Sequence, residues 1–183
     1  AWALLSMDLT SQYFSEQRAA TKEASRTALA HAVQYAPTAW QTLRSEGFYR
    51  RNVARDYDGA IERMTSAKAR SPGNASVAHH LAATLWIGGR FPEALAEAER
   101  AAALDPRNEN ALARLGRLEM WLRDYSSASR DIGRALALDR GGRSLALGDT
   151  VWLTVASGNT AAIPAILAPL RPDAIDYHII EIQ

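Results

Sequence analysis

The side chains with the clearest capacity for chemistry are two adjacent histidines, His79 and His80. Imidazole is a common zinc ligand, but neighbouring residues of a helix point about 100° apart and do not readily face one ion, whereas residues four apart do. The chain has no cysteine, which excludes a cysteine-ligated zinc site, a thiol nucleophile and a disulfide framework. We therefore predict no metal site, with one histidine in a groove and the other structural.

The carboxylates are plentiful, but their spacing is that of a solvated helix surface. Glu93 and Glu97, for example, accompany Arg90 and Arg100 at the intervals of helical ion pairs. General acid–base catalysis needs carboxylates in a shared, partly desolvated cleft, and the sequence gives no sign of one. The glycine pair at 88–89 lacks the flanking residues of a phosphate-binding loop. We predict no catalytic residue and no cofactor, and therefore no enzyme.

Charge and hydropathy argue against two further classes of partner. The net charge of the 183 residues is +1, and the basic residues are scattered along the chain. A nucleic-acid surface normally needs a clustered basic face, so we predict no nucleic-acid partner. No apolar run approaches the roughly 20 residues of a membrane span. The expected compartment is the cytoplasm, with the periplasm as the alternative.

A period of 34 residues runs through the middle of the chain. Alanine columns at this interval would let two helices approach closely where they cross, and an aromatic column would fill the space beside the crossing. Proline at the same interval would end one helix pair before the next begins. The columns are Tyr57, Phe91 and Tyr125; Ala60, Ala94 and Ala128; Ala67, Ala101 and Ala135; and Pro72 and Pro106, each proline being followed two residues later by asparagine.

Apolar stripes predict helices in the segments between these prolines. Ala78, Leu81, Ala82 and Leu85 follow the i, i+3, i+4, i+7 pattern, and the next helix follows a glycine break. The predicted fold class is all-α, a right-handed superhelical solenoid of antiparallel helix hairpins forming a single domain over 1–183. The expected units are 1–37, 38–74, 75–108, 109–142 and 143–171, with 172–183 as a C-terminal capping segment.

The ends of the chain are less regular than its middle. The first hairpin is expected to pair a helix at 1–14 with a longer one at 19–35, and the fifth to pair helices at 144–157 and 161–170. Pro37 and Pro72 are 35 residues apart, so we expect one inserted residue, between Gly47 and Asp56. Terminal units of a solenoid are commonly atypical.

These residues resemble the tetratricopeptide repeat. The segment 82–106 is similar to a complete unit, and Leu115-Gly116, Tyr125, Ala128 and Ala135 match a second. The resemblance implies a scaffold that binds a protein or peptide partner on its concave face. One subtype grips a C-terminal carboxylate with Lys, Asn and Arg, and of its aligned positions only Arg114 fits. Those positions are Ser45, Tyr49, His80, Asn110 and Arg114.

A narrower resemblance supplies the alternative function. The long first unit and the segment 47–60 are similar to repeat regions that follow the output domain of some bacterial nucleotide cyclases, winged-helix regulators and kinases. The chain opens at Ala1 without methionine or the basic flank of a signal peptide, so we interpret it as the interior of a longer protein. On this alternative it would be the regulatory or sensory region of such a signalling enzyme.

The resemblance places the first helix of each hairpin on the concave face. Trp86 lies off the packing stripe and is expected either to anchor a partner or to join the core, whereas Trp2, Trp40 and Trp152 are expected in the core. By the 34-residue period, the concave stripe also includes Ser45. The partner-binding residues predicted on this face are Tyr49, Asn52, His79, Ala83, Trp86, Ala113, Arg114, Arg117 and Met120.

Overall fold

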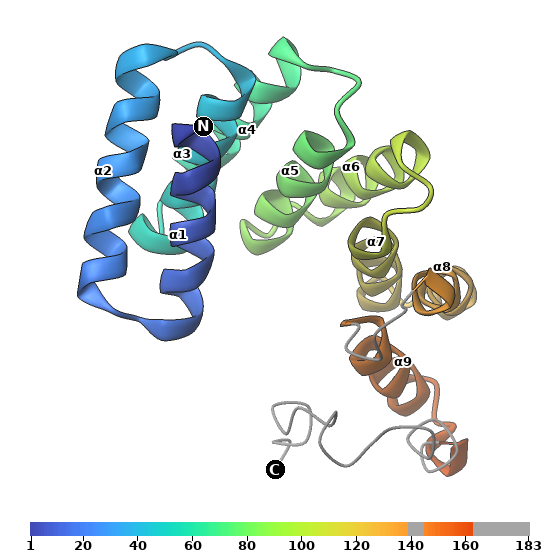
Figure 1. The fold of residues 1–183 in the computed structure, drawn as a ribbon. Coiled ribbons are helices and arrows are strands. Elements are labelled where there is room, and N and C mark those ends of the chain that lie inside the picture. Colours follow the sequence, from blue (N-terminus) through green and yellow to red (C-terminus); the bar gives the residue numbers. More distant parts are fainter. Residues whose placement is uncertain (139–144, 163–183) are drawn as a thin grey trace. The chain divides into compact units, whose positions relative to one another are not determined.

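All the regular elements in the described part of the chain are helices. The structure, a computed structural model, describes residues 1–138 and 145–162 (Figure 1). Within those two ranges there is no strand, which confirms the all-α fold class. The chain divides into two compact units, Ala1–Leu104 and Asp105–Gln183, which are described in turn.

The first unit consists of three antiparallel hairpins. The first helices of successive hairpins contact one another, α1 with α3 and α3 with α5, while α4 packs between its own partner α3 and the next helix α5. The predicted boundaries of the first hairpin agree closely with the observed ones. The hairpins are α1 (Trp2–Glu16) with α2 (Ala19–Tyr35), α3 (Trp40–Tyr49) with α4 (Tyr57–Arg70), and α5 (Ala75–Ile87) with α6 (Phe91–Leu104).

The second unit pairs α7 (Glu109–Trp121) with α8 (Tyr125–Leu138) and packs α9 (Leu145–Ala156) against both. The helix expected over 144–157 is thereby confirmed. After it, a short 3₁₀ turn occupies Thr160–Ala162. The remainder of the second helix expected at 161–170, and the capping segment expected at 172–183, lie outside the described residues.

The alanine columns lie where the two helices of each hairpin cross. All six alanines of the two columns have an exposed fraction of 0%. A further small residue on the facing helix completes the crossing, because a methyl group placed on Gly116 would lie 2.5 Å from Ile132 Cγ1, and one placed on Gly47 would lie 3.0 Å from the Ala60 carbonyl oxygen. The period therefore records the positions where no larger side chain fits.

The polar residues of the repeat begin its helices. Asn74 and Asn108, which follow the two prolines, each accept a hydrogen bond from the backbone N–H three residues ahead, at 3.2 and 3.1 Å. Asp56 and Asp124 do the same at the start of α4 and α8. Such caps satisfy backbone donors that the helix leaves without a partner, and each contributes about 1 kcal/mol.

The tight turn within each hairpin also repeats. Arg55, Gly89 and Arg123 stand 34 residues apart, and each has a positive φ, of 58°, 77° and 66°. This left-handed conformation is easy for glycine and costs an arginine roughly 1 kcal/mol. The three turns therefore share one backbone geometry, although only one of them has glycine at this position.

The inserted residue in the second hairpin forms a π-helical turn. The helix α3 continues without a break into a π-helical segment, η1 (Arg50–Ala54), which ends at the left-handed Arg55. A π turn absorbs one extra residue because its hydrogen bonds close over five residues rather than four. The insertion predicted between Gly47 and Asp56 is confirmed.

Two of the three tryptophans expected in the core are exposed. Trp40 packs against the buried cluster of Leu43, Ala67 and Val77, as predicted. Trp2 and Trp152 are 42% and 44% exposed. Both lie in α1 and α9, the end helices of the described repeats, where neighbouring helices cover fewer sides.

The crossing alanines should not accept a larger side chain. We expect Ala94→Leu and Ala128→Leu each to lower the free energy of unfolding by roughly 1–3 kcal/mol, because both positions are fully enclosed. Urea denaturation would measure this. Ala96→Leu and Ala137→Leu, at exposed positions of the same two helices, are the matched controls and should change stability by less than about 0.5 kcal/mol. Equal losses at all four positions would contradict the crossing geometry.

Candidate binding surface

The predicted stripe on α5 is partly open. His79 and Trp86 are each half-buried, and the rings of His79 and His80 meet edge to face with centroids 5.3 Å apart. Ala83 is only 2% exposed, so its prediction as a surface residue is wrong. It is enclosed because α5 is packed by α3, α4 and α6, which leaves a narrower open strip than the helical pattern suggests.

The π turn corrects the alignment of α3. The helices α3 and α5 begin after Ala39 and Asn74, which are 35 residues apart, so the extra residue lies after Gly47. The α3 equivalents of His79 and Ala83 are therefore Arg44 and Phe48, not Ser45 and Tyr49 as the 34-residue period predicted. Ser45 is in fact buried, at 1% exposure.

The two other residues predicted on this helix, Tyr49 and Asn52, are half-buried. Burial raises the pKa of the Tyr49 phenol, with smaller effects from Arg26 and Glu23. The Asn52 side-chain amide donates a hydrogen bond of 2.9 Å to the Phe48 carbonyl oxygen within the π turn. Both residues thus keep limited exposure, and Asn52 also supports the local backbone.

Sequence reasoning missed two buried arginines on the same helix. Arg44 is 7% exposed, lies over the Trp40 ring at 5.1 Å and donates a hydrogen bond to the Ser76 hydroxyl on α5. Arg51 is 8% exposed, lies over the Phe48 ring at 4.9 Å and donates to the Thr84 hydroxyl at 3.3 Å. The signal that would have found them is the 35-residue interval, which aligns Arg44 with His79 and Arg51 with Trp86.

The predicted residues of α7 fall into two groups. Ala113 is 2% exposed, which removes it from the predicted surface. Met120 and Arg117 are half-buried, and Arg117 makes two hydrogen bonds to the Asp149 carboxylate of α9, at 2.7 and 2.9 Å. Ala113 is enclosed because α7 packs against both α8 and α9.

Arg114 adds a second cation to this pair. The pKa of its guanidinium is lowered to about 10, chiefly by burial and also by the charge of Arg117, while the charge of Asp149 acts in the opposite direction. Burial also raises the pKa of Asp149, although the hydrogen bond from Arg117 acts in the opposite direction. The inner side of α7 thus holds two arginines around one enclosed carboxylate.

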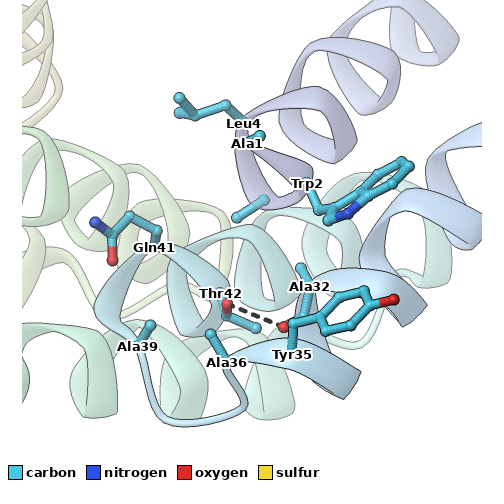
Figure 2. Close-up of a pocket in the computed structure, with 10 residues that line it drawn as sticks. Ala1, Trp2, Leu4, Ala32, Tyr35, Ala36, Ala39, Gln41 and Thr42 are labelled. Atoms are coloured by element: carbon cyan, nitrogen blue, oxygen red, sulfur yellow. Dashed lines mark hydrogen bonds between the residues drawn. The ribbon is translucent and has the colours of Figure 1, made fainter.

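A separate apolar pocket lies at the start of the first unit. It has a volume of about 330 Å³ and lies between the beginning of α1, the end of α2 and the beginning of α3 (Figure 2). Trp2 and Tyr35 are among the residues that line it, and the Thr42 hydroxyl donates a hydrogen bond of 3.5 Å to the Ala32 carbonyl oxygen. None of the predicted binding residues lines it.

The described residues contain no group of three or more histidines and carboxylates placed to hold a metal ion. None of the helices in these same ranges is long and apolar enough to cross a membrane.

Known proteins with a similar sequence or structure identify the fold. No protein-family model matches the chain. Over 85 residues, 46% of this chain, it is 38% identical to DnaJ homolog subfamily C member 7 of mouse and human, and it spans 17% of the length of those relatives. Among solved structures, a thermophilic tetratricopeptide protein of Thermus thermophilus superposes with a TM-score of 0.75 at 17% identity, over 97% of this chain and 94% of that one.

A second structural neighbour is the first tetratricopeptide domain of Spaghetti (RPAP3), bound to an HSP90 peptide. It superposes with a TM-score of 0.59 at 23% identity, over 67% of this chain and 93% of that one. These likenesses agree with the helix hairpins, the small crossing residues and the period of the sequence. The chain has the tetratricopeptide-repeat fold.

The corrected register also changes the comparison with the carboxylate-gripping subtype. The aligned positions on α3 become Arg44 and Phe48 in place of Ser45 and Tyr49. A basic residue then stands at two of the five positions, Arg44 and Arg114, rather than at Arg114 alone. Phe48, His80 and Asn110 still depart from the subtype's pattern.

The ion pair of Arg117 and Asp149 should behave as a coupled unit. We expect Arg117→Met to lower the free energy of unfolding by about 3 kcal/mol, because it leaves a carboxylate that is 3% exposed without its bidentate donor. The double substitution Arg117→Met with Asp149→Leu should recover most of this loss. Denaturation of the four proteins of this cycle provides the measurement, and additive losses would contradict the coupling.

The same cycle has an expected pH dependence. Without Arg117, the pKa of Asp149 in the folded protein should rise further above its unfolded value. A carboxyl group with a raised folded pKa costs stability above that pKa, and the cost disappears as the pH falls toward the unfolded value. The deficit of Arg117→Met should therefore shrink on acidification.

Proposed function

We propose that the chain is a protein-interaction scaffold that binds a segment of a partner protein on the first helices of its hairpins. The observation that carries the proposal is the half-buried strip on α5, where His79 and Trp86 remain accessible beside the cationic and aromatic residues of α3. Large rings and arginines dominate the binding energy of protein interfaces. Tyr49 at the end of α3 and Asn52 in η1 are half-buried and are proposed as further contacts.

The second unit offers its own set of contacts. Arg114, Arg117 and Met120 lie on α7, where a flexible thioether and two guanidinium groups suit a segment with apolar and acidic residues. Arg117 is hydrogen-bonded to the Asp149 carboxylate, which largely neutralises its charge. We therefore assign it the role of fixing the position of α9 beside the contact residues of α7. The first tetratricopeptide domain of Spaghetti (RPAP3) is bound to an HSP90 peptide, which supports peptide binding as a use of this fold.

Site-specific photo-crosslinking would test which face binds. Trp86 is replaced by p-benzoyl-phenylalanine in one protein and Glu99, an exposed residue of the second helix α6, in the other. We expect a discrete partner crosslink from position 86 and none from position 99. A crosslink from position 99 alone would place the partner on the opposite helices and contradict the proposal.

With the crosslinked partner in hand, the energetic contribution of Trp86 is measurable. We expect Trp86→Ala to weaken binding by about 2 kcal/mol or more, measured by calorimetry. The reason is that an indole ring that a partner covers is a typical anchor of a protein interface. Glu99→Ala is the control and should leave affinity unchanged. Glu97 would be a poor control, since it forms an ion pair with Lys68 of α4 and supports the packing. Unchanged affinity in Trp86→Ala would remove Trp86 from the site.

A further inference from the structure

The first unit contains two junctions between hairpins that can be compared position by position. Ala32 of α2 and Thr42 of α3 correspond to Ala67 of α4 and Val77 of α5, each 35 residues later in the chain. At the second junction, Ala67 and Val77 are fully enclosed and join Leu43 in a buried apolar cluster. The second junction is therefore closed by packed apolar side chains.

The first junction is less well packed. The Thr42 hydroxyl donates to the Ala32 carbonyl oxygen at 3.5 Å, which is long for a hydroxyl donor. The apolar pocket of about 330 Å³ lies beside this bond, so a cavity separates part of α2 from α3 (Figure 2). Side chains that line a cavity make fewer dispersion contacts than side chains in a filled interface.

The two junctions also differ in their polar contacts. Across the second junction, Arg44 and Arg51 each donate a hydrogen bond to a hydroxyl group of α5. Within the described ranges, each ion pair formed by the first hairpin joins two of that hairpin's own residues. Its attachment to α3 therefore rests mainly on apolar contacts.

The connection that follows α2 is held less firmly than the one that follows α4. The helix α5 begins after Asn74, whose side chain accepts a hydrogen bond from the Val77 N–H, and Arg100 of α6 donates to the nearby Pro72 carbonyl oxygen. The helix α3 begins after Ala39, which makes no side-chain cap. Residues 36–39 are therefore a suitable hinge.

The first hairpin is nevertheless well connected within itself. The Ser25 hydroxyl of α2 donates to the Ser6 carbonyl oxygen of α1 at 3.2 Å, which leaves the Thr10 hydroxyl to donate to Ser25 Oγ at 2.6 Å. All three residues are fully buried. Two helices linked at their crossing in this way would move as one body.

We propose that the first hairpin, α1 with α2, is a cover that opens as one body about residues 36–39 while α3 to α6 stay folded. Segments with fewer packed contacts open at a lower free energy than the whole fold. The opening itself does not depend on the proposed function. Its consequence for binding does, because α1 contacts α3 and η1, the elements that carry the proposed contacts Tyr49 and Asn52. Opening would make both elements more accessible to a partner.

Hydrogen exchange of the unaltered chain, followed by mass spectrometry, would test the proposal. The helices α2 and α4 are matched second helices, so their rates can be compared once each is corrected for its intrinsic rate. We expect α1 and α2 to exchange at one common rate, at least about tenfold faster than α4. Exchange of α2 as slow as that of α4 would overturn the proposal, and so would exchange of α1, α2 and α3 at one common rate.

A double substitution asks whether the junction, rather than the place of the hairpin among the repeats, controls the opening. Ala39→Asn with Thr42→Val gives α3 the residues that α5 has at the corresponding positions, 74 and 77. We expect exchange in α1 and α2 to slow at least about threefold while exchange in α5 and α6 is unchanged. Thr27→Val, at an exposed position of α2, is the control and should have no effect. Unchanged exchange in the double variant would contradict control by the junction.

A single thiol would report directly on the exposure of α3, because the chain has no cysteine. Thr42→Cys and Val77→Cys place the thiol at matching buried positions of α3 and α5. We expect a disulfide reagent to label position 42 at least about tenfold faster than position 77 under native conditions. Equal rates would show that α3 stays covered and would end the proposal.

These measurements separate the opening from the proposed function. Circular dichroism identifies any variant that fails to fold, and the exchange rates of the unaltered chain need no variant. If α2 exchanges as slowly as α4 while position 86 still crosslinks a partner, the cover is wrong and the proposed function stands. Fast exchange of the first hairpin without a crosslink from position 86 would support the cover and contradict the proposed binding face.

Discussion

The close crossing of two helices in each hairpin is the constraint on which the rest of the structure depends. Ala60, Ala94 and Ala128 are fully enclosed there, and Gly116 leaves no room for a methyl group beside Ile132. Because the helices approach so closely, each hairpin buries its interior with small side chains. Larger side chains such as Met64, Leu112 and Ile132 are buried beside the crossing rather than at it.

The second hairpin shows how this constraint accommodates a change. One extra residue after Gly47 cannot shift the crossing, so it is absorbed beyond it as a π turn. After the π turn, Arg55 adopts the same left-handed conformation as in the other hairpins, and α4 begins with Asp56 as its N-cap. The π turn also places Arg51 over the Phe48 ring and within hydrogen-bond distance of the Thr84 hydroxyl on α5.

Much of the fold could be predicted because the repeat encodes steric limits at a fixed interval. The candidate site was harder, since exposure depends on neighbouring helices that a single helix pattern does not contain. Ala83 and Ala113 have the right helical phase but are enclosed, and Ser45 was misplaced by one residue because the period was applied across the insertion. The pairing of Arg117 with Asp149 joins residues 32 apart, and neither residue signals the other in the sequence.

Two glycines on the facing helices of one hairpin test the crossing constraint most directly. A methyl group on Gly116 would lie 2.5 Å from Ile132 Cγ1, whereas one on Gly133 of α8 would meet nothing within 4 Å. Alanine is favoured over glycine in a helix by about 1 kcal/mol, so open space should reveal that gain. In urea denaturation, the account predicts that Gly133→Ala raises the free energy of unfolding by up to about 1 kcal/mol, while Gly116→Ala lowers it by roughly 1–3 kcal/mol. An equal gain in stability from both substitutions would contradict it.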